Sequence, residues 1–443
     1  MPGKCEPRPN KEMALWPEQP PEFSKLPLPD RLLVPVSARI GGEAKVLPAG
    51  TAVRRGQVLA VRAAESSHVT LAPADGVLEN VRPIRLSNGR PTLAVEMVVD
   101  HAGAGESFHD EAEDLREADP SALVTWIERI RRAGIWADRH ASPDLIGQLN
   151  QALSRPIDTV VCTVLDSDAS MRLNGTLVAR FGDCVAEGTA LLGRITGASR
   201  SILAVEADAH PAWAAPCWEA ARLAKLEVVE LANDYPQADP TLMVYSLTKR
   251  RLRPGNLPTT QGVLMVDAAT AWAIGQAARG LAMLSNPLAV HDHLRGRSHY
   301  LDVAVGTPLQ YVLEKISSWE EGFVVRGGDL LRDLRLRIDA VIGGGELTIH
   351  LTGPELAVIP EPCIRCAWCM DACPTLVHPA SVLEGAQRRD VSLAERAGLG
   401  ACIECGVCAH VCPSRLPILD AIREIRNQRS TSSRPERVEG KSQ

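Results

Sequence analysis

Eight of the twelve cysteines fall between Cys363 and Cys412, and their spacing constrains the fold more than any other feature of the chain. They form two copies of the pattern C-x2-C-x2-C-x3-C-P, the second of which ends at Pro413. Three thiolates at this spacing wrap around one iron–sulfur cluster, and the fourth, before the proline, ligates the other cluster in two-cluster ferredoxins. The segment is therefore predicted to fold around two neighbouring [4Fe-4S] clusters.

This exchange of the fourth cysteine gives the predicted ligand sets. Cluster one is expected to use Cys363, Cys366, Cys369 and Cys412, and cluster two Cys402, Cys405, Cys408 and Cys373. Structural zinc is the alternative, but zinc sites use pairs of cysteines without a third at the same spacing. The insert between the repeats, Thr375–Ala401, is expected to hold a helix around Ser392–Ala397 and to leave ligation unchanged.

The other cysteines do not indicate a disulfide scaffold, because the chain opens without a recognisable secretory signal. They are Cys5, Cys162, Cys184 and Cys217. The last three stand among apolar residues, where a free cysteine behaves as a small buried hydrophobe. His291 and His293 form an H-x-H pair, for which a metal site and ordinary packing are the two interpretations.

Charge and hydropathy argue against two classes of protein. The formal net charge is −6, whereas a nucleic-acid-binding protein usually shows a basic face. The most apolar stretch, Gly262–Leu284, contains Asp267, Gln276 and Arg279, and charges are costly in a bilayer span of about 20 residues. We therefore expect a cytoplasmic protein without a transmembrane segment of its own, which could still sit on a membrane through a partner.

Turns, apolar runs and helical spacings divide the chain into a multidomain α/β and α+β protein. The expected parts are an irregular tail at 1–30, a β domain at 31–105, an α/β domain at 121–285, an α+β module at 286–354, a helical cluster domain at 355–425 and a disordered tail at 426–443. The acidic stretch Glu106–Asp119 is expected to be a linker or a solvated helix face.

The two middle parts have a predicted order of elements. In the α/β domain, strands are expected at Thr159–Leu165, Ser201–Val205, Glu227–Leu231 and Gly262–Asp267, and helices at Ala122–Arg132, Pro211–Ala224 and Ala268–Leu284. In the α+β module, strands are expected at Tyr300–Val305, Gly322–Val325, Arg335–Ile342 and Glu346–Leu351, with a helix at Leu309–Ile316. The first order is typical of an open βαβ-type sheet.

Four stretches, taken with this domain order, resemble one family. Lys45–Val81 has the rhythm of a lipoyl-like module, Asn233–Thr270 is similar to a segment containing Y-P-Q-G-G-E, and Glu361–Pro374 and Ala401–Pro413 carry the cluster motifs. Together they resemble the C subunit of the Rnf electron transport complex, over about residues 30–425. The resemblance implies an N-terminal barrel-sandwich hybrid, an α/β domain of the NADH/FMN-binding type, an SLBB-like β-grasp module and a dicluster ferredoxin domain.

The chain departs from that family where NADH and FMN would bind. The family's glycine-rich loop, G-G-A-G-F-P-T, corresponds to Arg131–Leu145, which has a single glycine and places Asp138 and Arg139 in the loop. Glycine lets N–H groups approach a phosphate, and an aspartate repels it. The family's E-C-E-P-Y and Y-P-Q-G-G-E elements have become Cys162–Met171 and Tyr235–Pro240, both without glutamate.

These changes predict that the chain does not bind NADH as a typical family member does. The alternative is that another loop does so, and two stretches contain the glycines for that role. Gly343–Gly345 is better interpreted as a turn, and Arg326–Asp329 resembles a degenerate form of the family's G-G-P-M-M-G position.

Three functions follow from these patterns. The first is an electron relay, without acid–base residues of its own, between an unknown donor and a membrane complex at the inner face of the cell membrane. The second is an NADH-oxidising subunit with a diverged FMN and NADH pocket, and the third is an assembly subunit with structural clusters. Expected partners are other subunits of the complex and a ferredoxin or another redox protein. An acidic ferredoxin could be attracted by Arg365, Arg388, Arg389 and Arg415, unless these form an ordinary solvated surface.

Overall fold

The fold is taken from a computed structural model, which describes residues 19–36, 44–62, 69–103, 123–168, 171–209, 211–320, 322–354 and 358–432. The expectations for most of the N-terminal tail, for Glu106–Asp119 and for the tail after Ser432 lie outside the described residues. Within the described residues, no helix has the length and apolar character needed to cross a membrane.

The N-terminal part is a half-barrel made of two small antiparallel sheets. One sheet has the order β2-β8-β7-β4, with bounds Arg31–Pro35, Pro91–Val99, Gly76–Arg85 and Ala52–Val53. The other has the order β3-β5-β6, with bounds Ala44–Val46, Val58–Arg62 and Thr70–Leu71. Alternate side chains of these strands point inward, and Leu32, Leu59, Leu78 and Met97 form the centre of their core.

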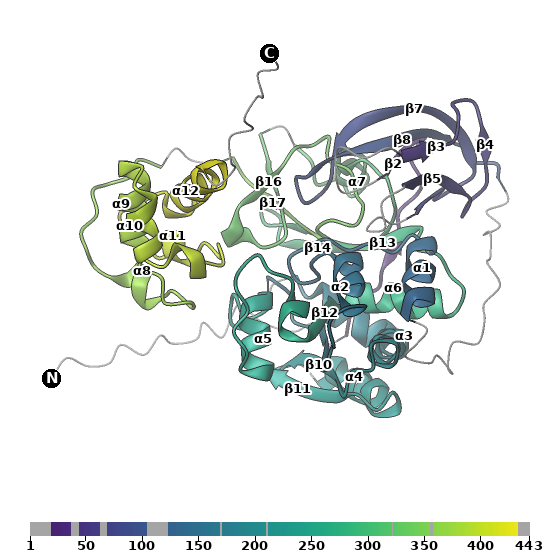
Figure 1. Cartoon of the computed structure of the whole chain (residues 1–443). Coiled ribbons are helices and arrows are strands. Elements are labelled where there is room, and N and C mark those ends of the chain that lie inside the picture. Colours follow the sequence, from purple (N-terminus) through teal and green to yellow (C-terminus); the bar gives the residue numbers. More distant parts are fainter. Residues whose placement is uncertain are drawn as a thin grey trace, which may run out of the picture.

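The α/β domain contains a four-stranded parallel sheet of order β11-β10-β9-β12, with bounds Glu227–Leu231, Arg200–Glu206, Thr159–Thr163 and Val263–Asp267. Its helices are α1 Leu123–Arg132, α2 Leu145–Ala152, α3 Leu173–Thr196, α4 Pro211–Leu223, α5 Pro240–Thr248, α6 Ala268–Ala278 and the 3₁₀ turn η3 Pro258–Gln261. Strand β9, in the interior of the sheet, and strand β12, at its edge, are both buried throughout, which explains the apolar residues at their centres. Figure 1 shows the helices on both faces of this sheet.

Next to it lies a six-stranded mixed sheet of order β1-β14-β13-β17-β15-β16. The bounds are Ser24–Lys25, Arg297–Ala304, Ser285–Asp292, Thr348–Thr352, Val324–Gly327 and Leu334–Leu336, with α7 Leu309–Lys315 and the 3₁₀ turn η4 Leu330–Arg332 between strands. Strand β1 lies in the segment expected to be irregular, and it forms because it pairs in parallel with β14. The strand expected at Arg335–Ile342 is limited to β16.

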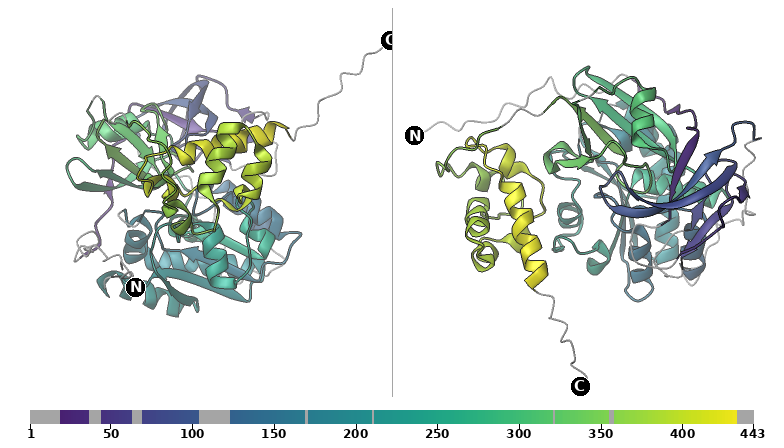
Figure 2. Two further views of the ribbon diagram at one scale, coloured as in Figure 1. Left: turned by 90° about the vertical axis from the view of Figure 1, so that its left-hand side faces the viewer. Right: turned by 90° about the horizontal axis from the view of Figure 1, so that it is seen from above.

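The cysteine repeats belong to a separate helical lobe. It contains α8 Trp368–Asp371, α9 Pro379–Arg388, α10 Val391–Arg396, the 3₁₀ turn η5 Leu399–Ala401, α11 Val407–His410 and α12 Ile418–Ser432. Helix α12 continues past Arg426, where a disordered tail was expected to begin, and Arg426 itself is held there because its Nη2 donates to the carbonyl oxygens of Leu399 and Cys402. Figures 1 and 2 show this lobe beside the α/β domain and the six-stranded sheet.

Candidate functional site

The two cysteine repeats wind with the same backbone conformation. Arg365 and Glu404, each two residues after the first cysteine of its repeat, have φ angles of 57° and 54°. Ala367 and Gly406, two residues further on, have φ angles of 67° and 79°. Positive φ is uncommon outside glycine, so its recurrence at equivalent positions indicates that both loops are held in one specific shape.

All four predicted ligands of cluster two line one cavity. Cys402, Cys405 and Cys408 reach it from the second repeat, and Cys373 reaches it from the first. The backbone N–H of Val377 donates to Cys373 Sγ at 3.3 Å. The crossed ligand set therefore agrees with the way in which the two repeats pack together.

The thiols at cluster two are protected from water. Burial raises the pKa of Cys405 to about 11 and the pKa of Cys408 to about 12. The backbone N–H of Glu404 donates to Cys402 Sγ at 3.4 Å, a contact that would also stabilise a bound thiolate. Metal coordination deprotonates a thiol outright, so this set of donors fits an iron–sulfur cluster.

The predicted ligands of cluster one lie nearer the surface. Cys363 and Cys366 are exposed, and Cys369 and Cys412 are half-buried. Burial, and then the neighbouring thiolates of Cys366 and Cys412, raise the pKa of Cys369. Cys412 of the second repeat thus lies close to thiols of the first. The ligand sets stay predictions, and the described part of the chain contains no group of three His, Cys, Asp or Glu side chains placed to hold a single metal ion.

The loop of cluster two is docked on the rest of the protein through its backbone. Arg332 Nη1 donates to the carbonyl oxygen of Ile403 at 2.8 Å, and Arg332 Nε donates to Asp329 Oδ2 at 3.0 Å. The hydroxyl of Tyr235 lies within hydrogen-bond distance of the carbonyl oxygen of Cys405 and of Asp329 Oδ1. Cluster two therefore faces the body of the protein.

Replacing Gly406 with alanine is expected to push the lobe away from the body. A Cβ at this position would lie 1.9 Å from the carbonyl oxygen of Leu331, and the φ angle of 79° is also strained for alanine. Overpacking of this kind typically costs about 1–3 kcal/mol. Hydrogen exchange of the backbone around Cys402 should become faster. Ala367→Gly, the reverse change at the equivalent position, is the control and should leave this exchange unchanged.

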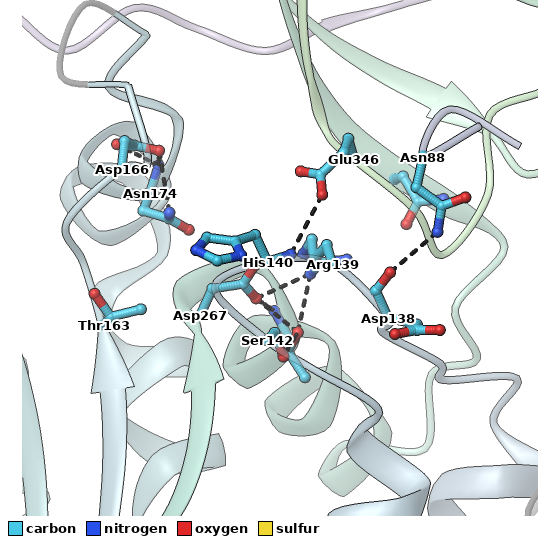
Figure 3. A network of polar contacts seen from close by, with 12 residues as sticks. Asn88, Asp138, Arg139, His140, Ser142, Thr163, Asp166, Asn174, Asp267 and Glu346 are labelled. Carbon is cyan, nitrogen blue, oxygen red and sulfur yellow. Dashed lines mark hydrogen bonds and ion pairs between the residues drawn. The ribbon is translucent and has the colours of Figure 1, made fainter. Parts of the chain in front are cut away.

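Three stretches correspond to the family's flavin and nucleotide elements, namely Arg131–Leu145, Cys162–Met171 and Tyr235–Pro240. They meet at the carboxyl edge of the parallel sheet, the place where open α/β folds bind ligands. Figure 3 shows the polar groups that fill this place. Arg139 Nε donates to Asp267 Oδ2, and Arg139 Nη2 donates to Asp267 Oδ1 and to Thr270 Oγ1, both at 2.9 Å. Arg139 is 8% exposed and Asp267 is 3% exposed. A buried ion pair therefore stands in the loop that was expected to correspond to the family's glycine-rich loop, and we call it the Arg139–Asp267 plug.

The N-terminus of α2 is closed in a similar way. Asp144 precedes the helix, and its Oδ1 accepts a hydrogen bond from the backbone N–H of Gly147 at 3.0 Å. Free N–H groups in the first turn of a helix are what usually hold a phosphate. Here a carboxylate already occupies one of them, and its charge repels an anion.

The second stretch contributes an acid whose pKa lies near neutrality. Asp166 accepts hydrogen bonds from the backbone N–H and from Nδ2 of Asn174, both at 3.0 Å. Burial raises the pKa of Asp166 to about 7, although these bonds oppose the shift. Asn174 Oδ1 is buried and finds no hydrogen-bond partner among the described residues.

The raised pKa predicts a pH dependence of stability. Because the folded state holds the proton of Asp166 more tightly than the unfolded state, this contribution is fully present below pH 4 or so and is lost as the pH rises through about 7. Asp166→Asn keeps a neutral side chain at every pH. Denaturant unfolding at pH 6 and pH 8 should therefore show a smaller loss of stability in the variant than in the parent chain; an equal loss would show that Asp166 is already ionised at pH 6.

The third stretch joins this region to the loop of cluster two. His140 Nε2 lies 2.9 Å from Asp239 Oδ2, close enough for an ion pair, although it is not aligned for a hydrogen bond. Arg332 Nη2 reaches the same oxygen at 3.0 Å. Burial works against ionisation, but His140 and Arg332 together hold the pKa of Asp239 below its ordinary value. Arg332 therefore contacts both Asp239 and the backbone of the cluster loop.

A cavity of about 890 Å³ lies between this region and cluster two. This is within the range of ligand pockets in proteins. Its lining residues include Asp138, Arg139, His140, Asp239, Leu252, Arg332, Glu346, Cys402, Ile403 and Glu404. A small molecule held in the cavity would contact the loop that carries Cys402.

The two glycine stretches do not form a phosphate loop. A Cβ on Gly344 would lie 2.2 Å from the ring of Trp136, so Gly344 is needed for close packing. Arg326 pairs with Asp333 at 2.7 Å, and Asp329 takes part in docking the cluster loop. Both stretches thus have structural contacts of their own.

The H-x-H pair and the arginines also lie outside the site. His293 Nε2 lies 3.0 Å from His350 Nδ1, and burial, followed by the charge of nearby His291, lowers the pKa of His293 to about 4. Neither histidine is part of a metal-binding group in the described residues. The four arginines expected to attract a ferredoxin are exposed, namely Arg365, Arg388, Arg389 and Arg415.

Two parts of the chain match known protein families. A family model described as the Nuo51 FMN-binding domain matches residues 143–276, and one described as a 4Fe-4S dicluster domain matches residues 356–428. The C subunit of the ion-translocating oxidoreductase complex of Edwardsiella ictaluri is 25% identical over 369 residues, which cover 80% of this chain and 45% of that protein. The chain is a distant, RnfC-like homologue of such C subunits. This confirms the resemblance found in the sequence. The flavin-domain match begins at Pro143, so Arg139 lies outside it.

Other relatives give the same picture. The C subunit of the Na(+)-translocating ferredoxin:NAD(+) oxidoreductase complex of Acetobacterium woodii is 24% identical over 239 residues, covering 53% of the RnfC-like chain and 54% of that protein. The C subunit of the ion-translocating oxidoreductase complex of Pseudomonas aeruginosa is 26% identical over 392 residues, which cover 85% of this chain and 49% of that protein. The RnfC-like chain spans about half the length of the curated relatives it matches. A chain in the crystal structure of NAD+-reducing [NiFe]-hydrogenase in the H2-reduced state has a TM-score of 0.46 at 15% identity, covering 74% of this chain and 66% of that one.

Proposed function

We propose that this RnfC-like chain is an electron-relay subunit of an ion-translocating complex and is held at the inner face of the cell membrane by the other subunits. It would work through two [4Fe-4S] clusters, each of which, when bound, carries one electron at a time. The ligands we assign are Cys363, Cys366, Cys369 and Cys412 for cluster one, and Cys402, Cys405, Cys408 and Cys373 for cluster two. The chain itself holds the thiols, donates N–H groups to sulfur and fixes cluster two against the body.

The Arg139–Asp267 plug is the observation that carries the second part of the proposal, namely that the chain does not bind FMN or NADH in the family's way. A phosphate in the loop would need exposed N–H groups, but it would meet the carboxylates of Asp144 and Asp267. To make room, the chain would have to break a buried ion pair, which typically costs about 3–5 kcal/mol when one partner is lost. The residues present therefore do not fit FMN in this place.

The finer assignments of domains also belong to this proposal. We infer that the N-terminal half-barrel is a barrel-sandwich hybrid and that the six-stranded module is of the SLBB-like β-grasp type. Both would position the relay within the complex. A ferredoxin or another redox protein is the expected electron partner.

Titration with FMN tests the missing flavin site directly. Flavin fluorescence is quenched on binding to most proteins, so saturable quenching by the chain would reveal a site. We expect no saturable quenching, with or without rebuilt clusters. Saturable, stoichiometric quenching by the parent chain would reveal a flavin site and contradict the proposal.

The cavity of about 890 Å³ favours one second candidate, an NADH-oxidising subunit with a diverged pocket. In that case the nucleotide would lie next to the loop of cluster two. His140→Trp would then fill part of the cavity and abolish reduction by NADH while reduction by dithionite continued. Under the relay proposal, NADH reduces neither the parent chain nor this variant.

A further inference from the structure

The segment that carries the first cysteine repeat exposes several large apolar side chains. Within residues 358–376, the exposed large apolar side chains are Val358, Ile359, Ile364, Trp368, Met370 and Leu376, with exposed fractions of 54%, 82%, 66%, 57%, 37% and 90%. We call these six residues the apolar collar. Cys363 and Cys366 are exposed in the same segment. Large exposed apolar patches usually mark an interaction site, and six such side chains lie within this one short segment.

The second cysteine repeat shows what covers such a surface. Ile403 is equivalent to Ile364, but it is 6% exposed, compared with 66% for Ile364. Its backbone is bonded to Arg332, and Gly406 of the same repeat lies against the carbonyl of Leu331. Figure 1 accordingly shows α11 nearer the body than α8. At cluster two, this face is therefore covered by another protein surface.

The two faces share one backbone shape and differ in what covers them. In the described residues, nothing comparable to Arg332 or Leu331 contacts Ile364. Ala367 of the first repeat carries a Cβ at the position equivalent to Gly406, and both residues have positive φ angles. The face at cluster one thus repeats, without its cover, a face that is built for protein contact.

We propose that the apolar collar docks the next redox protein in the electron path, a protein that presents an apolar face with its own redox centre beneath it. This proposal rests on the relay function proposed above. It divides the lobe into two ends. Cluster two is fixed against the chain's own body, and cluster one faces a separate partner.

Charge and symmetry argue against the other occupants. Within residues 358–376, which carry the apolar collar, the charged side chains are Glu361, Arg365 and Asp371. One cation and two anions give this segment a net charge of −1. Anionic lipid surfaces attract polybasic segments, and this segment is not one. A second copy of the chain would bring cluster one against cluster one. Electrons could then pass only between two identical clusters and would not reach a different acceptor. The partner should therefore be held mainly by apolar contact, and its binding should depend little on salt.

Photo-crosslinking in cells tests the identity of the occupant. A benzoylphenylalanine at Leu376 should form an adduct with a protein that carries a flavin, haem or iron–sulfur centre. The same group at Leu223, which is also exposed, is the control and should not form that adduct. A lipid, a second copy of the chain, a protein without a redox centre, the same adduct from both positions or no adduct at all would each overturn the proposal.

A second experiment measures electron transfer to the partner so identified. In the variant Ile364→Gln, Trp368→Gln, Leu376→Gln, the rate from the dithionite-reduced chain should fall by roughly tenfold or more, because exposed aromatic anchors dominate many interfaces. A matched control changes Val124, Trp218 and Leu223 to glutamine, all exposed elsewhere, and should keep the parental rate. An equal fall in both variants, or in neither, would overturn the role of the collar.

The two proposals can fail separately. If dithionite fails to reduce both clusters in the parent chain, the relay itself is wrong, whatever the collar binds. If dithionite reduces both clusters equally in the parent and the collar variant and the transfer rate is unchanged, only the docking proposal is wrong. Iron content and visible spectra of the variant should match those of the parent, because none of the three residues is an assigned ligand.

Discussion

Replacing Cys373 with alanine is expected to remove cluster two and spare cluster one, although Cys373 belongs to the first repeat. Its thiol lies in the cavity with Cys402, Cys405 and Cys408. Iron should fall from about eight atoms per chain towards about four, because each cluster holds four irons. Iron analysis, together with the electron paramagnetic resonance spectrum of the reduced protein, measures both changes.

Two other variants complete this experiment. Cys412→Ala should give the opposite loss, of cluster one with cluster two retained. Cys217→Ala removes a buried cysteine that lies far from the repeats in sequence, and it should leave the iron content unchanged. If Cys373→Ala lost cluster one and kept cluster two, the ligands would not cross between the repeats, and the assigned sets would be wrong.

Replacing Arg139 with alanine should strongly destabilise the α/β domain. The substitution removes the positive charge beside the buried carboxylate of Asp267. The hydrogen bonds that Thr270 donates to this carboxylate remain. Breaking a buried pair by removing one partner typically costs about 3–5 kcal/mol. Denaturant unfolding followed by circular dichroism measures the loss.

A double variant separates the charge from the packing. In Arg139→Met, Asp267→Asn the charge disappears from both sides, and most of the lost stability should return. If the double variant were as unstable as Arg139→Ala, the plug would act through side-chain volume and not through ion pairing.

The same pair predicts a response to acid. Burial opposes ionisation, but Arg139 and Thr270 hold the pKa of Asp267 below its ordinary value. A lowered carboxyl pKa stabilises the folded state above the unfolded pKa of about 3.9, and this stabilisation is lost as the pH falls through the folded value. The stability difference between the parent and the double variant should therefore shrink as the pH is lowered below 4 or so.

The cysteine spacing and the buried strands could be predicted because each depends on local sequence. Strands β9, β10 and β12 each contain a short apolar run, and Glu227–Leu231 is found with the expected bounds. Helix α10 lies within a residue of the expected Ser392–Ala397. Helix α3, the longest of the described helices, was not predicted. Its sequence has glycines at 175, 182, 188 and 193, and Gly188 is needed because α6 packs directly against it.

The chemistry of the altered flavin region could be predicted only in part. The loss of glycines from Arg131–Leu145 indicated that the loop had changed. That Arg139 pairs with Asp267 could not be predicted, because the two are 128 residues apart and meet only through the fold of the sheet. The difference in burial between the two cysteine repeats could not be predicted for the same reason. The repeats have the same cysteine spacing, and only tertiary contacts distinguish Ile403 from Ile364.

The most direct test of the relay is the addition of NADH to the chain with its clusters rebuilt under anaerobic conditions, followed by the visible absorption of the clusters. The account predicts no bleaching by NADH, with or without added FMN, and full bleaching by dithionite. Prompt bleaching by NADH would show that the chain takes electrons from the nucleotide itself, and it would contradict the relay.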